Sequence, residues 1–192
     1  MSQNPSAAVG QVSADGQFRW DGQQWVPIPR GVREPTPWTR PMQLAAAALL
    51  AVEAVYSVAT TVIFTNHDAI KRALAAQGTQ VPPNMSEDTY INVVIATAVG
   101  FVVFIALLEL VGAVGSYLGW RWIFWAVLVL MALGGINALF NLGSIARPGP
   151  YGPPVTVAIV HELLTLAAAA MFVWMLIGAI RYGPWAMKRP GA

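Results

Sequence analysis

The sequence predicts an all-α integral membrane protein, a four-transmembrane-helix bundle with a short N-terminal cytoplasmic β-hairpin. The first reason is composition: of 192 residues, 56% are hydrophobic and only 10% are charged, whereas a soluble domain usually carries about 25% charged residues. The second is that the apolar residues form long blocks, and a helix of roughly 20 apolar residues crosses the hydrocarbon core of a bilayer. Since lipid offers the backbone no hydrogen-bond partners, each block should be helical. Within a transmembrane domain of residues 42–185, the blocks cover residues 42–65, 90–115, 123–142 and 155–180.

Lysine and arginine residues predict which way these helices cross the membrane, because positive charge is enriched on the cytoplasmic side. Most of the 11 basic residues precede the first block, follow the last or lie between the second and third: Arg19, Arg30, Arg33, Arg40, Arg121, Arg181, Lys188 and Arg189. The other two connections hold only Lys71, Arg72 and Arg147. We therefore expect both termini to be cytoplasmic, with tryptophan anchors at that interface, namely Trp38, Trp120, Trp122 and Trp185.

The chain before the first apolar block divides into three parts. Residues 1–14 are small and polar, and we expect them to be disordered. Residues 15–28 contain Asp21-Gly22 between two short alternating runs, which predicts a β-hairpin with a type I′ turn. A two-residue turn would pair Trp20 with Gln23 and Phe18 with Trp25, placing Phe18, Trp20 and Trp25 on one face. Residues 29–41 are rich in proline and should form a stiff linker.

The hairpin segment resembles a known module. The residues Phe18-Arg-Trp-Asp-Gly-Gln-Gln-Trp25 are similar to the short Trp-Asp-Gly-x-x-Trp module at the ends of many bacterial, especially actinobacterial, membrane proteins. The Trp-Tyr-Pro-Asp lead-in of the better-known version is replaced by Ser13-Ala-Asp-Gly16. The rest of the chain resembles small four-helix actinobacterial membrane proteins in which a Gly-x-x-Trp stretch joins the second and third helices, as Gly119-Trp-Arg-Trp122 does here. The resemblance implies this topology in a bacterial plasma (inner) membrane and implies no activity.

The connections between the blocks carry their own signals. Asn66 or Thr65 could cap a short helix that ends at Gly78, and Ser86 could cap the second apolar helix. Because residues 118–122 are a very short connection, the second and third apolar helices should be antiparallel neighbours. Residues 147–154, rich in proline and glycine, should form an extended turn, and residues 186–192 a basic cytoplasmic tail.

Several polar residues interrupt the apolar blocks, and ionisable groups inside a membrane span indicate function by default. With a helix rise of about 1.5 Å per residue, Glu53 should lie at mid-membrane and Glu109 roughly 9 Å to the cytoplasmic side. The others should lie in the outer half of the bundle. We expect the whole set to face the bundle interior, because lipid offers no hydrogen-bond partner: Glu53, Glu109, Asn137, Asn141, His161 and Glu162.

Two roles compete for these residues. They could hold the helices together by hydrogen bonds, typically worth about 0.6 kcal/mol each, or they could relay protons or hold a cation. No lysine or arginine lies within a block to neutralise the carboxylates, so burial favours their protonated forms. His161 and Glu162 are adjacent and point about 100° apart on a helix, so we predict no metal site.

The sequence contains no phosphate-binding loop, serine elbow or kinase-like motif, so it predicts no catalytic residues and no cofactor. The lack of cysteine excludes disulfides and thiolate chemistry, and no basic aromatic stripe indicates nucleic acid. We favour a non-enzymatic accessory or scaffold subunit whose hairpin docks a membrane or cytoplasmic protein. The alternative is a small proton- or cation-coupled transporter or sensor. A transporter would need to form a homo-oligomer in the lipid bilayer, because four helices make a small pore wall.

Overall fold

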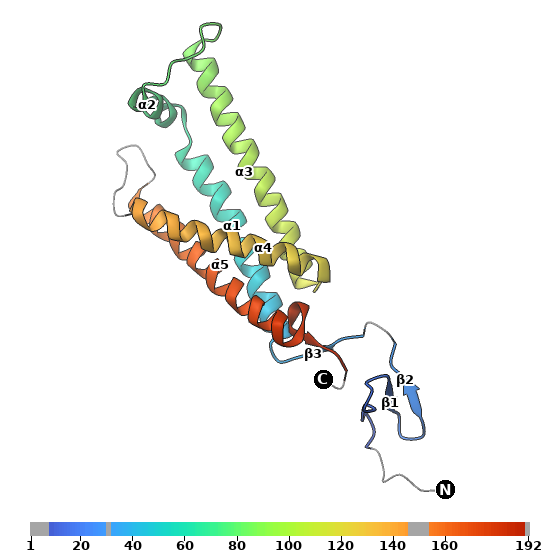
Figure 1. The fold of residues 1–192 in the computed structure, drawn as a ribbon. Coiled ribbons are helices and arrows are strands. Elements are labelled where there is room, and N and C mark those ends of the chain that lie inside the picture. Colours follow the sequence, from blue (N-terminus) through green and yellow to red (C-terminus); the bar gives the residue numbers. More distant parts are fainter. Residues whose placement is uncertain (1–7, 30–31, 146–153, 191–192) are drawn as a thin grey trace.

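The computed structural model describes residues 8–29, 32–145 and 154–190, with backbone only for residues 139–145 (Figure 1). This part of the chain contains five α-helices and a small N-terminal two-stranded sheet. The helices are α1 (Thr39–Phe64), α2 (His67–Gln77), α3 (Glu87–Tyr117), α4 (Arg121–Ile145) and α5 (Val155–Tyr182). All except α2 are long and apolar enough to cross a membrane. Each begins and ends within a few residues of a predicted block.

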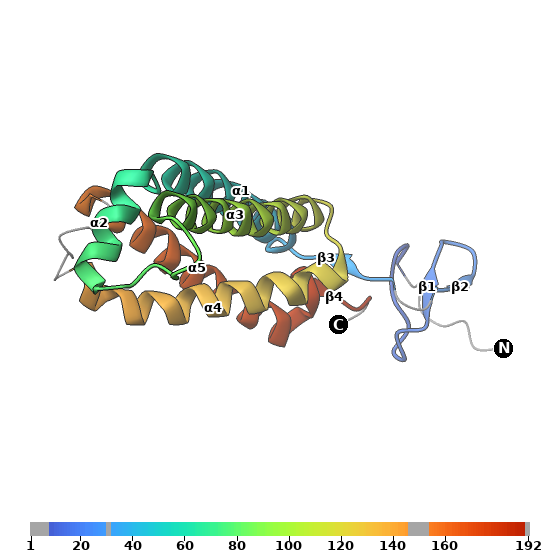
Figure 2. The ribbon, with the colours of Figure 1, turned by 90° about the horizontal axis from the view of Figure 1, so that it is seen from above.

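The four long helices form two pairs (Figures 1 and 2). Helix α1 packs along α3, α4 packs along α5, and α1 also contacts α5. Small residues allow close approach: a Cβ atom at Gly135 of α4 would lie 2.9 Å from the Cβ of Ala169 on α5. Large apolar side chains cover the outer surfaces, as Val55 and Ile180 do, which is typical of helices that contact lipid or a partner.

The prediction that the helices joined by residues 118–122 are antiparallel neighbours holds only beside that connection. There, Gly115 of α3 packs directly on Ile123 of α4. From this point α3 and α4 diverge, and each pairs instead with another helix (Figures 1 and 2). A short connection brings two helix ends together, but it does not determine the angle between the helix axes.

The connection between α1 and α3 folds as its capping residues predict. The Asn66 side chain accepts a hydrogen bond from the amide of the third following residue, at 3.0 Å. Gly78 ends α2 in the left-handed conformation with φ 63°, where glycine carries no steric cost. Ser86 caps α3 through its side chain. Two side-chain contacts then join α2 to the first turn of α3: His67 Nε2 lies 3.2 Å from an Asp88 carboxylate oxygen, and Lys71 forms an ion pair with Glu87 at 3.3 Å.

The N-terminal hairpin forms, but its predicted register is wrong. Strand β1 (Phe18–Trp20) pairs with β2 (Trp25–Pro27) so that Trp20 opposes Trp25 and Phe18 opposes Pro27. The Asp21 carboxylate accepts hydrogen bonds from the amides of Gln23 and Gln24, both at 2.7 Å, and thereby holds a loop of residues 21–24 in place of a two-residue turn. This register still places Phe18, Trp20 and Trp25 on one face.

Residues 8–14 are also ordered, contrary to the predicted disorder, whereas residues 1–7 lie outside the described chain. The segment 10–13 runs along the free edge of β1, where Val12 forms a bridge with Arg19. The Ser13 amide donates to the Phe18 carbonyl, and the Trp20 amide donates to the Gln11 carbonyl. Strand β1 therefore has a partner on both edges, which supports a hairpin that would be marginal as two strands alone.

A second small sheet joins the segments that flank the helices. Strand β3 (Glu34–Pro35) pairs with β4 (Met187–Lys188), which follows the 3₁₀ helix η1 (Pro184–Ala186). We call residues 34–39 and 184–188 the terminal clasp. The expected linker and tail are thus partly bonded to each other, because two extended segments at the same end of the helices satisfy each other's backbone groups. The predicted turn at residues 147–154 lies outside the described chain except for Pro154.

Trp185 is the centre of the terminal clasp and not the interfacial anchor that we predicted. Its side chain is fully buried, and its Nε1 donates to the Trp120 carbonyl at 3.0 Å. Its ring packs edge-on against Phe124, with 5.1 Å between the centroids. The hydroxyls of Thr36 and Thr39 donate to the carbonyl of the next residue in η1, at 2.8 and 3.0 Å. The tryptophan lies at the predicted end of the bundle but is enclosed by protein.

Candidate functional site

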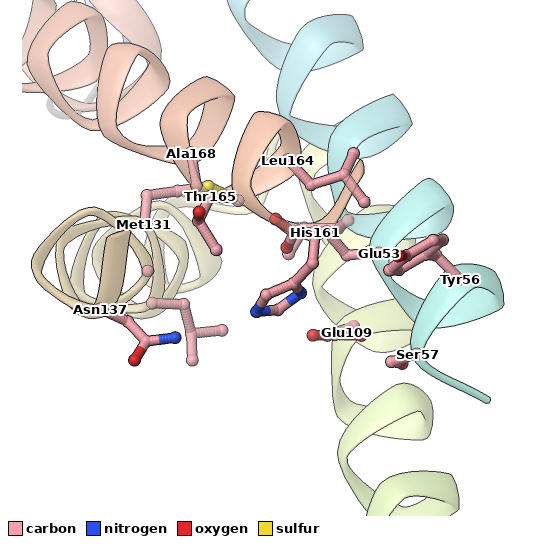
Figure 3. A pocket seen from close by; sticks show the side chains of 13 residues that line it. Glu53, Tyr56, Ser57, Glu109, Met131, Asn137, His161, Leu164, Thr165 and Ala168 are labelled. Atoms are coloured by element: carbon pink, nitrogen blue, oxygen red, sulfur yellow. The ribbon is translucent and has the colours of Figure 1, made fainter. Parts of the chain in front are cut away.

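A pocket of about 210 Å³ lies between the two helix pairs, and all four long helices contribute to it (Figure 3). Its position follows from the pairing, because α1 and α3 form one wall while α4 and α5 form the other. Seven lining residues carry polar side chains: Glu53, Tyr56, Ser57, Glu109, Asn137, His161 and Thr165. The remaining lining residues are apolar or glycine: Leu50, Leu130, Met131, Gly134, Leu164 and Ala168.

Close packing of α1 on α3 brings the two carboxylates together. Leu50 of α1 fits against Gly112 of α3, where a Cβ atom would lie 3.1 Å from its Cδ1. Glu53 and Glu109 each stand one helical turn beyond this contact, on the same side of it. They are within electrostatic reach of each other. The contact between Leu50 and Gly112 sets the stagger of α1 against α3, which an estimate of depth from the midpoint of each helix does not include.

Tyr56 and His161 form the side of the pocket where α1 meets α5. The Tyr56 hydroxyl donates to the Val157 carbonyl at 2.6 Å. The Tyr56 ring also stacks on the His161 imidazole, with 6.5 Å between centroids and 14° between planes. The sequence analysis missed Tyr56, although a signal was present: it lies three residues after Glu53 and hence on the same face of the helix.

The pocket is acidic and lacks a fixed positive charge. None of its lining residues is lysine or arginine. The Glu109 carboxylate and the His161 imidazole point towards each other into the pocket (Figure 3), and Glu109 Oε2 is buried without a hydrogen-bond partner. Among the residues that the structure describes, no three His, Asp or Glu side chains lie close enough together to hold one metal ion.

The structure separates the predicted candidates into two groups. Glu53, Glu109, Asn137 and His161 line the pocket. Glu162 does not, although it is only 5% exposed and its Oε1 lacks a hydrogen-bond partner. The side chain of Asn141 lies outside the described part of the chain.

The pocket also reaches the surface of the molecule. Asn137 and His161 are exposed, and Leu130 is 44% exposed. Leu130 and Asn137 stand in the interior of α4, and His161 stands in the second turn of α5. The exposed lining residues therefore belong to α4 and α5, and the pocket opens along the sides of these helices.

The aromatic face of the hairpin is a second candidate site, and the hairpin lies beyond the end of the long helices (Figure 1). Phe18 and Trp20 are half-buried, while Trp25 is 41% exposed and lies 5.6 Å from Trp20 between ring centroids. The loop that positions them depends on Asp21, and hydrogen bonds from the amides of Gln24 and Gln23 lower the pKa of its carboxyl. Gly22 has φ 106° in this loop, a conformation that favours glycine.

Comparison of the chain with protein-family models, curated proteins and solved structures finds no match. The fold and the pocket therefore define the protein by themselves. It is a mostly helical protein with four membrane-length helices and an acidic pocket between two helix pairs.

Proposed function

We propose that this chain is a multi-pass protein of a bacterial plasma membrane, with both termini cytoplasmic, and that it is a small proton- or cation-coupled transporter or sensor. The bulk of apolar surface on the four long helices supports a membrane location. The excess of arginine at the end that carries both terminal segments supports the orientation. The hairpin would then lie in the cytoplasm. The observation that carries the function is the acidic pocket that Glu53 and Glu109 line.

The geometry changes the balance between the two roles that the sequence left open. A polar residue that holds helices together must reach a partner on another helix. Glu53 and Glu109 instead face a cavity, and neither makes a hydrogen bond to another described residue; one Glu109 oxygen is buried without a partner. In such a site, a carboxylate that binds a proton or a cation has a lower free energy than a carboxylate that stays charged and unpaired. These carboxylates therefore fit binding better than adhesion.

A titration of the carboxyl groups tests this function. The full chain in lipid nanodiscs is titrated while infrared spectroscopy follows the carboxyl C=O band, and flux is measured in reconstituted vesicles under proton and cation gradients. Glu53→Gln and Glu109→Gln should each remove part of the titrating band and reduce flux. Glu162→Gln is the matched control, since this buried carboxyl lies outside the pocket. If both pocket variants titrate and transport like the wild type, the proposal fails.

A docking role for the hairpin is a second candidate, favoured by the exposed Trp25 on an element that projects beyond the helices (Figure 1). The similarity of this segment to a bacterial membrane-protein module supports the same role. A photo-crosslinking residue at position 25 should then capture a specific protein in cells, whereas one at Gln23 in the loop should not. A matching deletion should stop at residue 29, because removal of residues 34–39 would also break the terminal clasp. Equal crosslinking from both positions would exclude an aromatic docking face.

A further inference from the structure

We propose that the ligand of the pocket is a small organic cation, an ammonium group that carries an apolar substituent. The inference rests on the proposed function, because it names the class of cation that the pocket would bind.

The charges of the pocket select a cation. Glu53 and Glu109 come from neighbouring helices, and the lining contains no lysine or arginine to balance them. In a medium of low dielectric, two nearby carboxylates destabilise each other unless one of them is protonated or a positive charge lies between them. A buried Glu109 oxygen that has no hydrogen-bond partner provides an acceptor for such a charge.

The remaining walls distinguish an organic cation from a metal ion. Zinc usually takes four donors from Cys, His, Asp or Glu side chains, but no three such side chains of the described chain lie close enough together to hold one metal ion. Leu50, Leu130 and Leu164 instead provide apolar contacts, and the rings of Tyr56 and His161 form an aromatic edge. Quaternary ammonium groups bind to aromatic walls through cation–π attraction. At about 210 Å³, the pocket is smaller than the roughly 300–1,000 Å³ of drug-sized sites, so the ligand is small.

The route to the pocket agrees with this class. The opening at Leu130, Asn137 and His161 lies along the sides of α4 and α5, at positions that would face lipid in the proposed membrane. A hydrated inorganic ion would have to lose its water in hydrocarbon before it reached this opening, which is costly. A cation with an apolar substituent partitions into the bilayer and reaches the opening from there.

Benzyltrimethylammonium is a suitable probe, and its binding to the full chain in nanodiscs can be measured by isothermal titration calorimetry. Neopentylbenzene has the same shape without the charge, and choline has the same head group without the aromatic substituent. We expect the probe to bind at least about tenfold more tightly than either compound, as expected for a charge-assisted contact and for burial of an apolar ring. Glu53→Gln and Glu109→Gln should each weaken its binding at least about tenfold, while Glu162→Gln should leave it unchanged.

The outcomes separate the ligand class from the proposed function. If the carboxyl groups titrate and sodium ions bind, but benzyltrimethylammonium neither binds nor competes, the pocket is a proton or inorganic-cation site and this inference is wrong. Equal affinity for the probe and neopentylbenzene also overturns it, because the charge would then contribute nothing. That comparison uses only the wild type, so it decides the question even if the glutamine variants fail to fold. If no carboxyl titrates and no cation binds, the proposed function fails together with the ligand class.

Discussion

Replacing the buried Trp185 by phenylalanine tests whether the terminal clasp holds the helices together. The indole Nε1 donates to the Trp120 carbonyl at 3.0 Å, and a hydrogen bond of this kind contributes about 1 kcal/mol net. The Trp120 carbonyl also accepts from the amide of Phe124, so the substitution does not leave it unpaired. A smaller ring leaves a void of about 40 Å³, which costs about 1 kcal/mol at roughly 24 cal/mol per Å³. We therefore expect Trp185→Phe to lower the free energy of unfolding by about 2 kcal/mol.

Two further variants bracket this value. Trp185→Ala removes the whole ring and should cost about 3–5 kcal/mol. Trp122→Phe is the matched control at the same end of the bundle: Trp122 is 62% exposed and makes only a stacking contact with Trp120. Its replacement should change stability by less than about 0.5 kcal/mol.

The assay is unfolding of the purified full chain in mixed micelles, with the proportion of denaturing detergent raised while circular dichroism follows helix content. The order of stabilities should be wild type and Trp122→Phe together, then Trp185→Phe, then Trp185→Ala. If Trp185→Phe is as stable as Trp122→Phe, residue 185 is not enclosed by the helices. The argument that the clasp contributes to stability would then be wrong.

Three further predictions use other contacts. Gly115→Ala should destabilise by about 1–3 kcal/mol in the same assay, because its methyl would lie 2.5 Å from a side-chain carbon of α4, whereas Gly100→Ala on the same helix meets nothing within 4 Å and should be neutral or slightly stabilising. Thr39→Val should cost about 1–2 kcal/mol, because it removes the bond to the η1 carbonyl and the bond from the Thr36 amide; a loss no larger than that of the Gly100 variant would argue against the clasp. The amides of Gln23 and Gln24 lower the pKa of Asp21, so its support for the hairpin loop is present above the unfolded pKa of about 3.9 and is lost as the pH falls through the lower folded value. Amide exchange at these two glutamines should therefore accelerate only in strong acid, and Asp21→Asn, which cannot titrate, should abolish this dependence.

The parts of the fold that were predictable depend on local information. A run of apolar residues identifies a helix whatever surrounds it, so the four long helices could be located from the sequence alone. The caps at Asn66, Gly78 and Ser86 are equally local, since each acts on an amide or carbonyl within a few residues. The shared aromatic face of the hairpin was also predictable, because alternation along a strand keeps it in either register.

What could not be predicted depends on contacts between distant segments. Strand β4 has only two residues, and its partner β3 lies near the other end of the chain, so no periodicity indicates it. The hairpin register was set by the Asp21 side chain, which competes with the backbone of a type I′ turn. Trp185 could not be recognised as buried, because a tryptophan at the end of a helix reads as an interfacial anchor unless the enclosing segments are known.

The same limitation explains why the sequence named six polar candidates but could not select among them. Facing inward is a property of one helix, whereas lining a common pocket depends on how helices cross. Leu50 packs on Gly112 and so brings Glu53 level with Glu109, although the two residues stand at different heights on their own helices. Helix α1, which carries Glu53, packs against α3, α5 and η1, so it links the terminal clasp to both walls of the pocket. The separation of the two carboxylates therefore depends on how α1 crosses α3, and the same helix carries Thr39 of the clasp at its other end.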